Sequence, residues 1–201
     1  RVLTTTRLHV IIRPRGGDFL YSPLELERMA ADIDMARELG TDGVVFGCLR
    51  PDGSLDTEAN AMLMQHAKGM SVTFHRAFDR CADPRKALEE LIAQGFDRIL
   101  TSGQQPTAFE GTPLLKELHE QAKGRIIILA GCGVNEQNIA TIAQATHIHE
   151  FHFSARTAVK SQMQYSNPDV YMGAKDADED TLNITSSQRV AHTIEACLKG
   201  V

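Results

Sequence analysis

Short runs rich in β-branched and apolar residues recur along this chain at a fairly even interval, and that repeat limits the fold more than any other feature. Stretches with helical spacing lie between the runs. Strands that alternate with amphipathic helices are typical of βαβ units and a parallel sheet. We predict strands over six segments, which are Leu8–Arg13, Gly43–Cys48, Ser71–His75, Arg98–Thr101, Arg125–Ala130 and Ile148–Ser154.

Clear start and stop signals mark the intervening helices. Ser22-Pro23-Leu24-Glu25 has the form of a capping box with proline at the first helical position, and Gly40 can end that helix. Asp83-Pro84 opens a second helix, for which Gly95 is the stop signal. Asn135 is predicted to cap a third helix.

Two architectures fit this alternation, an open doubly wound sheet and a closed (β/α)8 barrel. The first predicted strand is not followed by GxGxxG, and the chain has no GxxxxGK[ST], so the two commonest open-sheet fingerprints are missing. A barrel usually needs about 250 residues, and two further βα units of about 25 residues each would supply the difference. Arg1–Thr6 is typical of the end of an earlier helix. We therefore expect residues 1–201 to form a single α/β domain, a parallel (β/α)8 TIM-type barrel without its first two βα units in this chain.

The segment after the last predicted strand differs from the rest. From Thr157 to Thr185 the chain is polar and has no firm periodicity, so two interpretations stay open: a long loop across the barrel mouth, or a mobile segment. A final helix over about Ser187–Leu198 would close the ring. The polar segment includes an acidic stretch of Asp176, Asp178, Glu179 and Asp180.

Charge and composition exclude several functions. A net charge of −5 gives no reason to expect nucleic acid, which demands a basic face. Apolar runs such as Ile126–Ala130 are too short to cross a bilayer, and no signal peptide is evident, so we expect a cytoplasmic protein. The cysteines form no CxxC pair, which favours reduced thiols over a disulfide framework. They are Cys48, Cys81, Cys132 and Cys197.

In a βα-barrel the working residues collect at the carboxyl ends of the strands. The first predicted strand runs into Arg13-Pro14-Arg15-Gly16-Gly17-Asp18, where a proline stiffens the turn and glycines allow a ligand close to the backbone. Arginines held in this way suit a carboxylate or a phosphate. The alternative is a structural pair of Arg13 or Arg15 with Asp18 that braces the loop. Both interpretations stay open.

A second group of polar residues follows the strand Ser71–His75. Side chains alternate along a strand, so Val72 and Phe74 share one face while Thr73 and His75 share the other. If the apolar pair packs on helices, His75 points into the barrel. Arg76 and Asp79 come directly afterwards and strengthen the case for a site.

The last predicted strand alternates Phe151 and Phe153 with three polar residues. By the same parity Glu150, His152 and Ser154 line the barrel interior. A buried carboxylate and imidazole must be hydrogen-bonded or paired, and a core of Val, Ile and Leu does not need them. We therefore favour a functional pocket over a polar network that only fixes the packing.

Glycines end the two preceding strands. Gly131 and Gly133 lie just ahead of a predicted helix N-terminus, where free N–H groups attract anions. With two units missing in front, this loop follows strand seven and Ser154 follows strand eight, the pair of loops that often binds phosphate in barrels. Ser102 ends the strand before them.

Taken together, four motifs resemble the CutC family, the so-called copper homeostasis proteins. The resemblance implies a (β/α)8 barrel, a cytoplasmic location, Cu(I) binding and a role in copper tolerance. The cysteines proposed for copper in this family lie on the two absent units, and Cys132 stands where the family is expected to carry a small residue. The metal ligands therefore stay unknown. The motifs are Ile12–Phe19 (IRPRGGDF), Thr73–Asp79 (TFHRAFD), Leu100–Gly103 (LTSG) and Glu150–Ala155 (EFHFSA).

Three functional hypotheses follow, the last of which is a structural or interaction barrel whose pocket is idle. The first is the copper homeostasis protein that the resemblance implies, with a copper ion as ligand. The second is a TIM-barrel enzyme that acts on a small anionic or phosphorylated metabolite at the barrel mouth, which suits the residues themselves better. None of these hypotheses requires nucleic acid or a membrane as a partner, and a homo-oligomer is left open. The catalytic candidates are His75, Arg76, Asp79, Glu150 and His152, and the anion-binding candidates are Arg13, Arg15, Asp18, Ser102, Gly131, Gly133 and Ser154.

Overall fold

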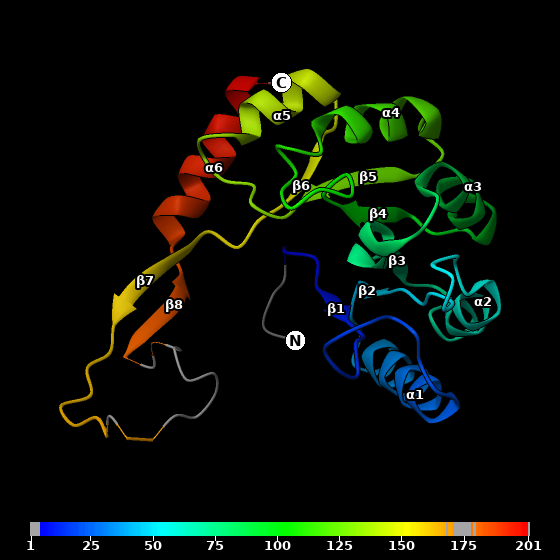
Figure 1. Ribbon diagram of the computed structural model, residues 1–201, viewed down its shortest axis with the longest axis horizontal. Coiled ribbons are helices and arrows are strands. Elements are labelled where there is room, and N and C mark those ends of the chain that lie inside the picture. The colour runs from blue at the N-terminus through cyan, green and yellow to red at the C-terminus, as the bar shows by residue number, and fades with distance from the viewer. Residues whose placement is uncertain (1–4, 168, 171–177, 179, 201) are drawn as a thin grey trace.

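The computed structural model describes residues 5–167, 169–170, 178 and 180–200 (Figure 1). Six parallel strands alternate with helices, and a two-stranded hairpin and a last helix follow. The predicted strands are all present, each with ends that differ by a few residues at most. The elements are β1 (His9–Ile11), α1 (Pro23–Glu38), β2 (Gly43–Phe46), α2 (Thr57–His66), β3 (Ser71–Phe74), the 3-10 helix η1 (Arg76–Arg80), α3 (Pro84–Gln94), β4 (Arg98–Thr101), α4 (Thr112–Ala122), β5 (Ile127–Gly131), α5 (Ile139–Thr146), β6 (Glu150–His152), β7 (Arg156–Lys160), β8 (Thr181–Thr185) and α6 (Ser187–Gly200).

The sheet is an open half-barrel. Its strands pair in the order β1-β2-β3-β4-β5-β6, which is the order of the chain and the order found in a βα-barrel. The helices cover the outer face in Figure 1, and β1 and β6 form the two edges. The expected fold class, a partial parallel barrel, is confirmed.

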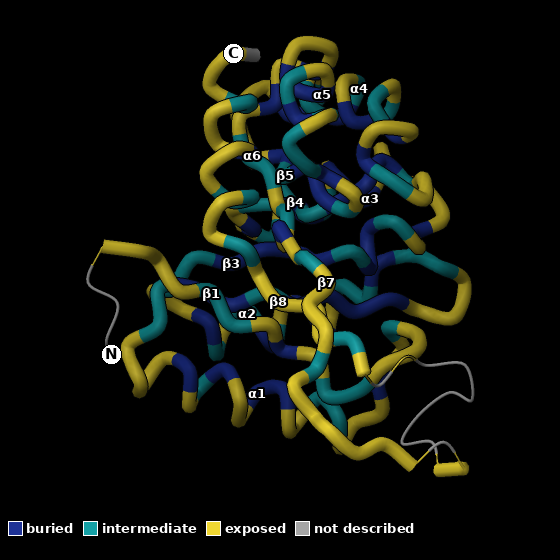
Figure 2. Tube along the Cα trace, turned by 90° about the vertical axis from the view of Figure 1, so that its left-hand side faces the viewer, coloured by how far each residue is buried: buried dark blue, intermediate teal, exposed yellow. Residues whose placement is uncertain are grey.

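The core lies between the sheet and the helices (Figure 2). Phe74 and Phe46 are fully buried and both pack edge-on against Phe96, at 5.5 Å between ring centroids. Val72 is also buried, and it lines a small pocket together with Met64 of α2 and Gln94 of α3. These contacts confirm that Val72 and Phe74 face the helices. On the opposite, concave face Ile11 is 61% exposed, because β1 is an edge strand of the open sheet.

The helix caps agree with the sequence at two of three positions. Ser22 and Glu25 form the expected capping box, and the side chain of Asp83 accepts from the backbone N–H of Arg85 and Lys86. The expected cap at Asn135 is wrong, because α5 begins at Ile139 and its N-cap residue is Asn138. The Asn135 side chain instead accepts from Gln137 N–H in a turn that precedes the helix.

The sequence indicates a long loop or a mobile segment from Thr157 to Thr185. The structure differs, because both ends of this segment are regular strands. β7 and β8 pair antiparallel at its two ends, and α6 follows. The Arg189 guanidinium on α6 bonds both oxygens of Glu136, ahead of α5, at 3.0 and 3.1 Å. The hairpin escaped prediction because its two strands are short and lie far apart in the sequence, so neither has a pairing partner nearby in the chain. Asp176 and Glu179 of the acidic stretch lie outside the described residues.

Within the described part of the chain, no helix has the length and apolar character needed to cross a membrane.

Candidate functional site

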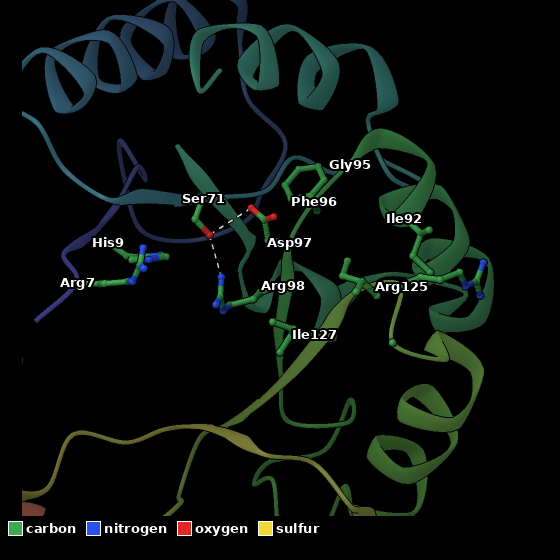
Figure 3. Close-up of a pocket in the computed structure, with 12 residues that line it drawn as sticks. Arg7, His9, Ser71, Ile92, Gly95, Phe96, Asp97, Arg98, Arg125 and Ile127 are labelled. Carbon is green, nitrogen blue, oxygen red and sulfur yellow. Dashed lines mark hydrogen bonds between the residues drawn. The ribbon is translucent and has the colours of Figure 1, made fainter. Parts of the chain in front are cut away.

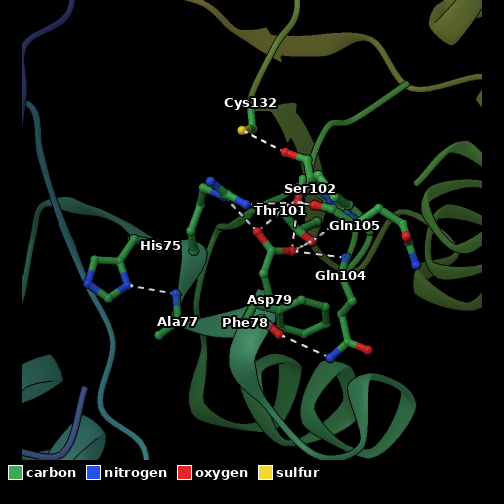
Figure 4. A network of polar contacts seen from close by, with 12 residues as sticks. His75, Ala77, Phe78, Asp79, Thr101, Ser102, Gln104, Gln105 and Cys132 are labelled. Carbon is green, nitrogen blue, oxygen red and sulfur yellow. Dashed lines mark hydrogen bonds and ion pairs between the residues drawn. The ribbon is translucent and has the colours of Figure 1, made fainter. Parts of the chain in front are cut away.

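Asp79 is the centre of a polar network at the carboxyl ends of β3 and β4 (Figure 4). Its Oδ1 accepts from Thr101 Oγ1 at 2.5 Å and from the backbone N–H of Ser102 at 3.0 Å and Gln104 at 3.1 Å. Its Oδ2 accepts from Arg76 Nε at 2.7 Å. The side chain is only 7% exposed. A single carboxylate therefore fixes the loop after β4, and its negative charge is balanced by the positive charge of Arg76.

Arg76 is oriented by this network. Besides Nε on Asp79, its Nη2 donates to Ser102 Oγ at 3.0 Å, and Ser102 Oγ donates onward to the carbonyl of Gln105 at 2.6 Å. The Arg76 side chain remains 41% exposed. No acceptor among the described residues contacts its Nη1. The guanidinium is thus held on one edge and available on the other.

His75 is the N-cap residue of η1 and is almost completely buried, at 3% exposure. Its Nδ1 accepts from the N–H of Ala77 at 3.3 Å, so the neutral ring carries its hydrogen on Nε2. Nε2 is buried and has no partner among the described residues. Burial, together with the nearby positive charge of Arg13, lowers the pKa of His75 to about 4. The imidazole is therefore neutral at physiological pH.

The loop after β1 covers His75. The ring of Phe19 lies 4.8 Å from the imidazole, centroid to centroid, and Arg13 stacks on Phe19 at 4.8 Å. Arg13 also donates to the carbonyl of Gly17 at 2.9 Å. Arg13 is thus brought to the same end of the sheet as His75, with an aromatic ring between the two.

Arg15 and Asp18 form the structural pair that the sequence left open. Arg15 Nη1 lies 2.9 Å from Asp18 and its Nε lies 2.6 Å from Glu25 on α1. Another donor of the same guanidinium bonds the carbonyl of Leu20 at 2.7 Å. These contacts engage Arg15 in holding the loop against α1.

The glycine loop after β5 is closely packed. A Cβ at Gly131 would lie 2.5 Å from Leu100 Cδ1, so only glycine fits without a shift. Cys132 adopts a left-handed φ of 81°, and its thiol donates to the carbonyl of Pro106 at 3.1 Å. The N–H groups of Gly133 and Val134 have no acceptor in the described part of the chain. The loop therefore offers donors at the place where the sequence predicts an anion.

Glu150 lies at the other end of the sheet. It begins β6, and its carboxylate bonds Arg98, at the start of β4, at 2.6 and 3.3 Å, passing over β5. Arg98 also donates to Ser71 Oγ at 2.8 Å. A pocket of about 650 Å³ opens at these amino ends, with His9 among its lining residues (Figure 3). Glu150 does face the barrel interior, and its carboxylate orients the guanidinium of Arg98.

The remaining candidates, at the end of β6 and just after it, are open to solvent. His152 and Ser154 are both exposed, because β6 is an edge strand. The imidazole of His152 has no hydrogen-bond partner among the described residues, although its backbone pairs with Gly131 of β5. The structure thus joins His75, Arg76, Asp79 and Ser102 in one region and leaves His152 and Glu150 outside that network.

Two arginines that the sequence analysis passed over line a second pocket. Its volume is about 660 Å³, and Arg50 and Arg80 border it together with Asp18 and Phe19. Arg50 follows the strand β2 and Arg80 ends η1. The rule that polar residues after strands form the site would have found Arg50 too.

The thiols do not assemble a soft-metal site. Among the described residues, no three His, Cys, Asp or Glu side chains are grouped so as to hold a metal ion. Burial raises the pKa of Cys48 and of Cys81 to about 12, so both stay protonated. Because thiolates are the ligands that Cu(I) prefers, the described residues do not offer a site that fits a copper ion.

Comparison with known proteins agrees with the motifs. The CutC family model matches residues 1–157. A CutC family protein of Bacteroides thetaiotaomicron is 63% identical over 97% of this chain and 79% of its own length. A human copper homeostasis protein cutC homolog is 47% identical over 96% of this chain and 70% of its own length.

Solved structures show the same fold. A CutC protein of Streptococcus agalactiae superposes with a TM-score of 0.70 at 39% identity, over 73% of this chain and 71% of that one. An aldolase, QR15, has a TM-score of 0.58 at 15% identity, over 75% and 69% of the two chains, and shares the fold alone. This chain belongs to the CutC family.

Proposed function

We propose that this chain serves copper homeostasis by binding a small anionic molecule, of the phosphate or carboxylate class, at the carboxyl end of its half-barrel. The observation that carries the proposal is the fixed orientation of the Arg76 guanidinium, which leaves one of its nitrogen atoms without an acceptor in the described part of the chain. Asp79 and Ser102 hold its guanidinium in place, while Nη1 has no acceptor among the described residues. A planar, permanently charged and pre-oriented guanidinium is suited to carboxylate and phosphate oxygens.

Two further features support an anion at this end. The negative charge of Asp79 is compensated by the donors around it, so this carboxylate does not strongly repel an anion bound beside Arg76. The free N–H groups of Gly133 and Val134 add neutral donors on the neighbouring loop. Gly131, Gly133 and Ser154 remain the anion-binding candidates with Arg76 and Arg13. Ser102 supports the site through Arg76, because its N–H is already on Asp79 and its hydroxyl hydrogen on the Gln105 carbonyl.

The proposal concerns binding and assigns no reaction. A general acid and base must both reach the reacting group. His75 lies under Phe19, His152 lies on the β6 edge, and Glu150 pairs with Arg98 at the opposite end. They stay candidates for proton transfer, each from a separate position.

The role in copper homeostasis is proposed from membership of the CutC family, not from a copper site in this chain. The described thiols do not fit a Cu(I) site, so this chain is expected to bind Cu(I) weakly or not at all. An anaerobic competition titration against a Cu(I) chelator tests this expectation. Tight, stoichiometric binding by the wild-type chain that is lost in Cys132→Ser would overturn it and assign the metal to the loop after β5.

Calorimetric titration with inorganic phosphate, followed by a panel of phosphorylated metabolites, tests the anion site. We expect Arg76→Gln to weaken binding about a hundredfold, the loss of a charge-assisted hydrogen-bonded contact. Arg80→Gln is the matched control, because Arg80 lies on the same 3-10 helix and is exposed. Equal affinity of Arg76→Gln and wild type would refute the assignment, and loss in Arg80→Gln alone would move the site to the pocket that Arg80 lines.

A further inference from the structure

The β7–β8 hairpin has one apolar face that its own chain leaves half uncovered. Thr157 lies opposite Ile184, and Val159 lies opposite Leu182, so these four side chains share a face. Val159 is 40%, Leu182 52% and Ile184 48% exposed. Figure 1 shows the hairpin extending from the foot of α6, away from the sheet. An isolated two-stranded sheet is marginally stable at best, so this one needs a further strand or surface.

The ladder identifies which backbone groups point outward. Ser186 N–H donates to the Ala155 carbonyl at 3.0 Å, and Ser161 N–H donates to the Asp180 carbonyl at 2.7 Å. In an antiparallel pair hydrogen-bonded and non-hydrogen-bonded pairs alternate. Asn183 therefore belongs to a non-hydrogen-bonded pair, and its N–H and C=O face away from β7. No described residue outside the ladder bonds them. The same parity turns Thr181 and Thr185 outward.

We propose that β8 pairs antiparallel with β8 of a second copy of this chain, about a two-fold axis at Asn183. The strand reads Thr-Leu-Asn-Ile-Thr, which is symmetric in residue character about its centre. In this register Asn183 of each copy exchanges both backbone hydrogen bonds with the other. Leu182 then lies opposite Ile184 of the second copy in a non-hydrogen-bonded pair, where side chains approach most closely. A two-fold interface requires this kind of self-complementarity.

The other edge of the hairpin is protected against the same pairing. Centred on Ala158, β7 would place Arg156 opposite Lys160 of the second copy, and like charges directly opposite each other are destabilising. The outward carbonyl of Arg156 is already bonded by the guanidinium of Arg189. Lysine and arginine on an edge strand are a common device against edge pairing. β8 carries no charged residue.

The pairing gives a four-stranded antiparallel sheet with the two β8 strands at its centre. Its apolar side chains all lie on one face, because a two-fold axis perpendicular to a sheet preserves the face. The hairpin thereby reaches the size at which a sheet with a hydrophobic face becomes stable. The surface involved lies beyond residue 157, where the family model ends.

A proline scan of the two edges tests the proposal by sedimentation equilibrium of the full chain. Asn183→Pro removes an outward N–H and leaves the hairpin ladder intact, because proline is tolerated where the N–H faces outward. We expect it to raise the dimer dissociation constant about a hundredfold, as two backbone hydrogen bonds are lost. Ala158→Pro is the matched control on the β7 edge and should dimerise like the wild type. A monomeric wild type, or equal effects of the two variants, would overturn the assignment.

Paired charges test the register. The double variant Leu182→Glu/Ile184→Lys places opposite charges across the two-fold axis and should remain a dimer that weakens with salt. The double variant Leu182→Lys/Ile184→Lys places like charges there and should be monomeric. Both double variants lose the same apolar residues, so a difference between them reports cross-strand pairing. Identical association of the two would contradict the Leu182–Ile184 register.

Discussion

The imidazole of His75 lies beneath the ring of Phe19, 4.8 Å from centroid to centroid, and its buried Nε2 hydrogen has no acceptor among the described residues. An unsatisfied buried donor costs about 1–3 kcal/mol. The loop after β1 therefore holds a neutral imidazole out of water at the carboxyl end of the sheet, where a displaced Phe19 would uncover it.

Removing the covering ring should make His75 accessible. We expect Phe19→Ala to destabilise the protein by about 2 kcal/mol, less than a fully buried phenylalanine because Phe19 is only partly buried. The pKa of His75 should rise from about 4 towards its ordinary value, because burial is the main cause of the shift. Histidine NMR titration measures the change. Phe109→Ala, on an exposed ring, is the control, and an unchanged His75 pKa in Phe19→Ala would show that other groups bury the imidazole.

Burial of His75 should also make stability depend on pH. The unfolded chain binds a proton on this ring near pH 6.5, but the folded chain binds it only near pH 4. The effect of His75 on the free energy of unfolding is therefore most favourable above pH 6.5. About 3 kcal/mol of that free energy is lost as the pH falls from 6.5 to 4. Urea unfolding across this range measures the slope. His75→Asn keeps a cap acceptor without titrating, so the same slope in that variant would assign the effect to other histidines.

Asp79 should matter for stability and for ligand binding together. Asp79→Ala leaves Arg76 without its partner and two backbone N–H groups without an acceptor. Because the carboxylate is buried, we expect a loss of about 3 kcal/mol and weaker phosphate binding, since Arg76 loses its orientation. Urea unfolding and calorimetry give the two quantities. Asp83→Ala removes only the cap of α3 and should cost about 1 kcal/mol with unchanged phosphate affinity. Full phosphate affinity in Asp79→Ala would separate Arg76 from the anion site.

The Arg98–Glu150 pair is expected to be structural. Its side chains are 24% and 38% exposed, so Glu150→Gln should cost about 1 kcal/mol, and less at high salt. Phosphate binding at the far end of the sheet should not change. Glu117→Gln, which removes the exposed pair with Arg85, is the control for surface charge loss. A large loss of phosphate affinity in Glu150→Gln alone would restore Glu150 to the functional site.

Local sequence determined the alternation of strands and helices and most of their ends. Ser22 and Glu25 predict the start of α1 because both halves of a capping box lie within one turn. The parity of Val72 and Phe74 correctly predicts the helix-facing side of β3, because side chains on a strand alternate whatever the neighbouring strands are. The CutC motifs could be read in the same way, since each occupies a short continuous segment.

Only the tertiary structure decided which of these residues meet. Asp79 and Ser102 are 23 residues apart, and Arg98 and Glu150 are 52 apart. Whether they touch depends on strand register and sheet curvature, which no local pattern encodes. The hairpin also depends on long-range pairing, because β7 and β8 lie far apart in the sequence and pair with each other. Sequence by itself thus determined the elements and the end of the sheet at which polar residues collect, whereas long-range pairing decided the contacts among them.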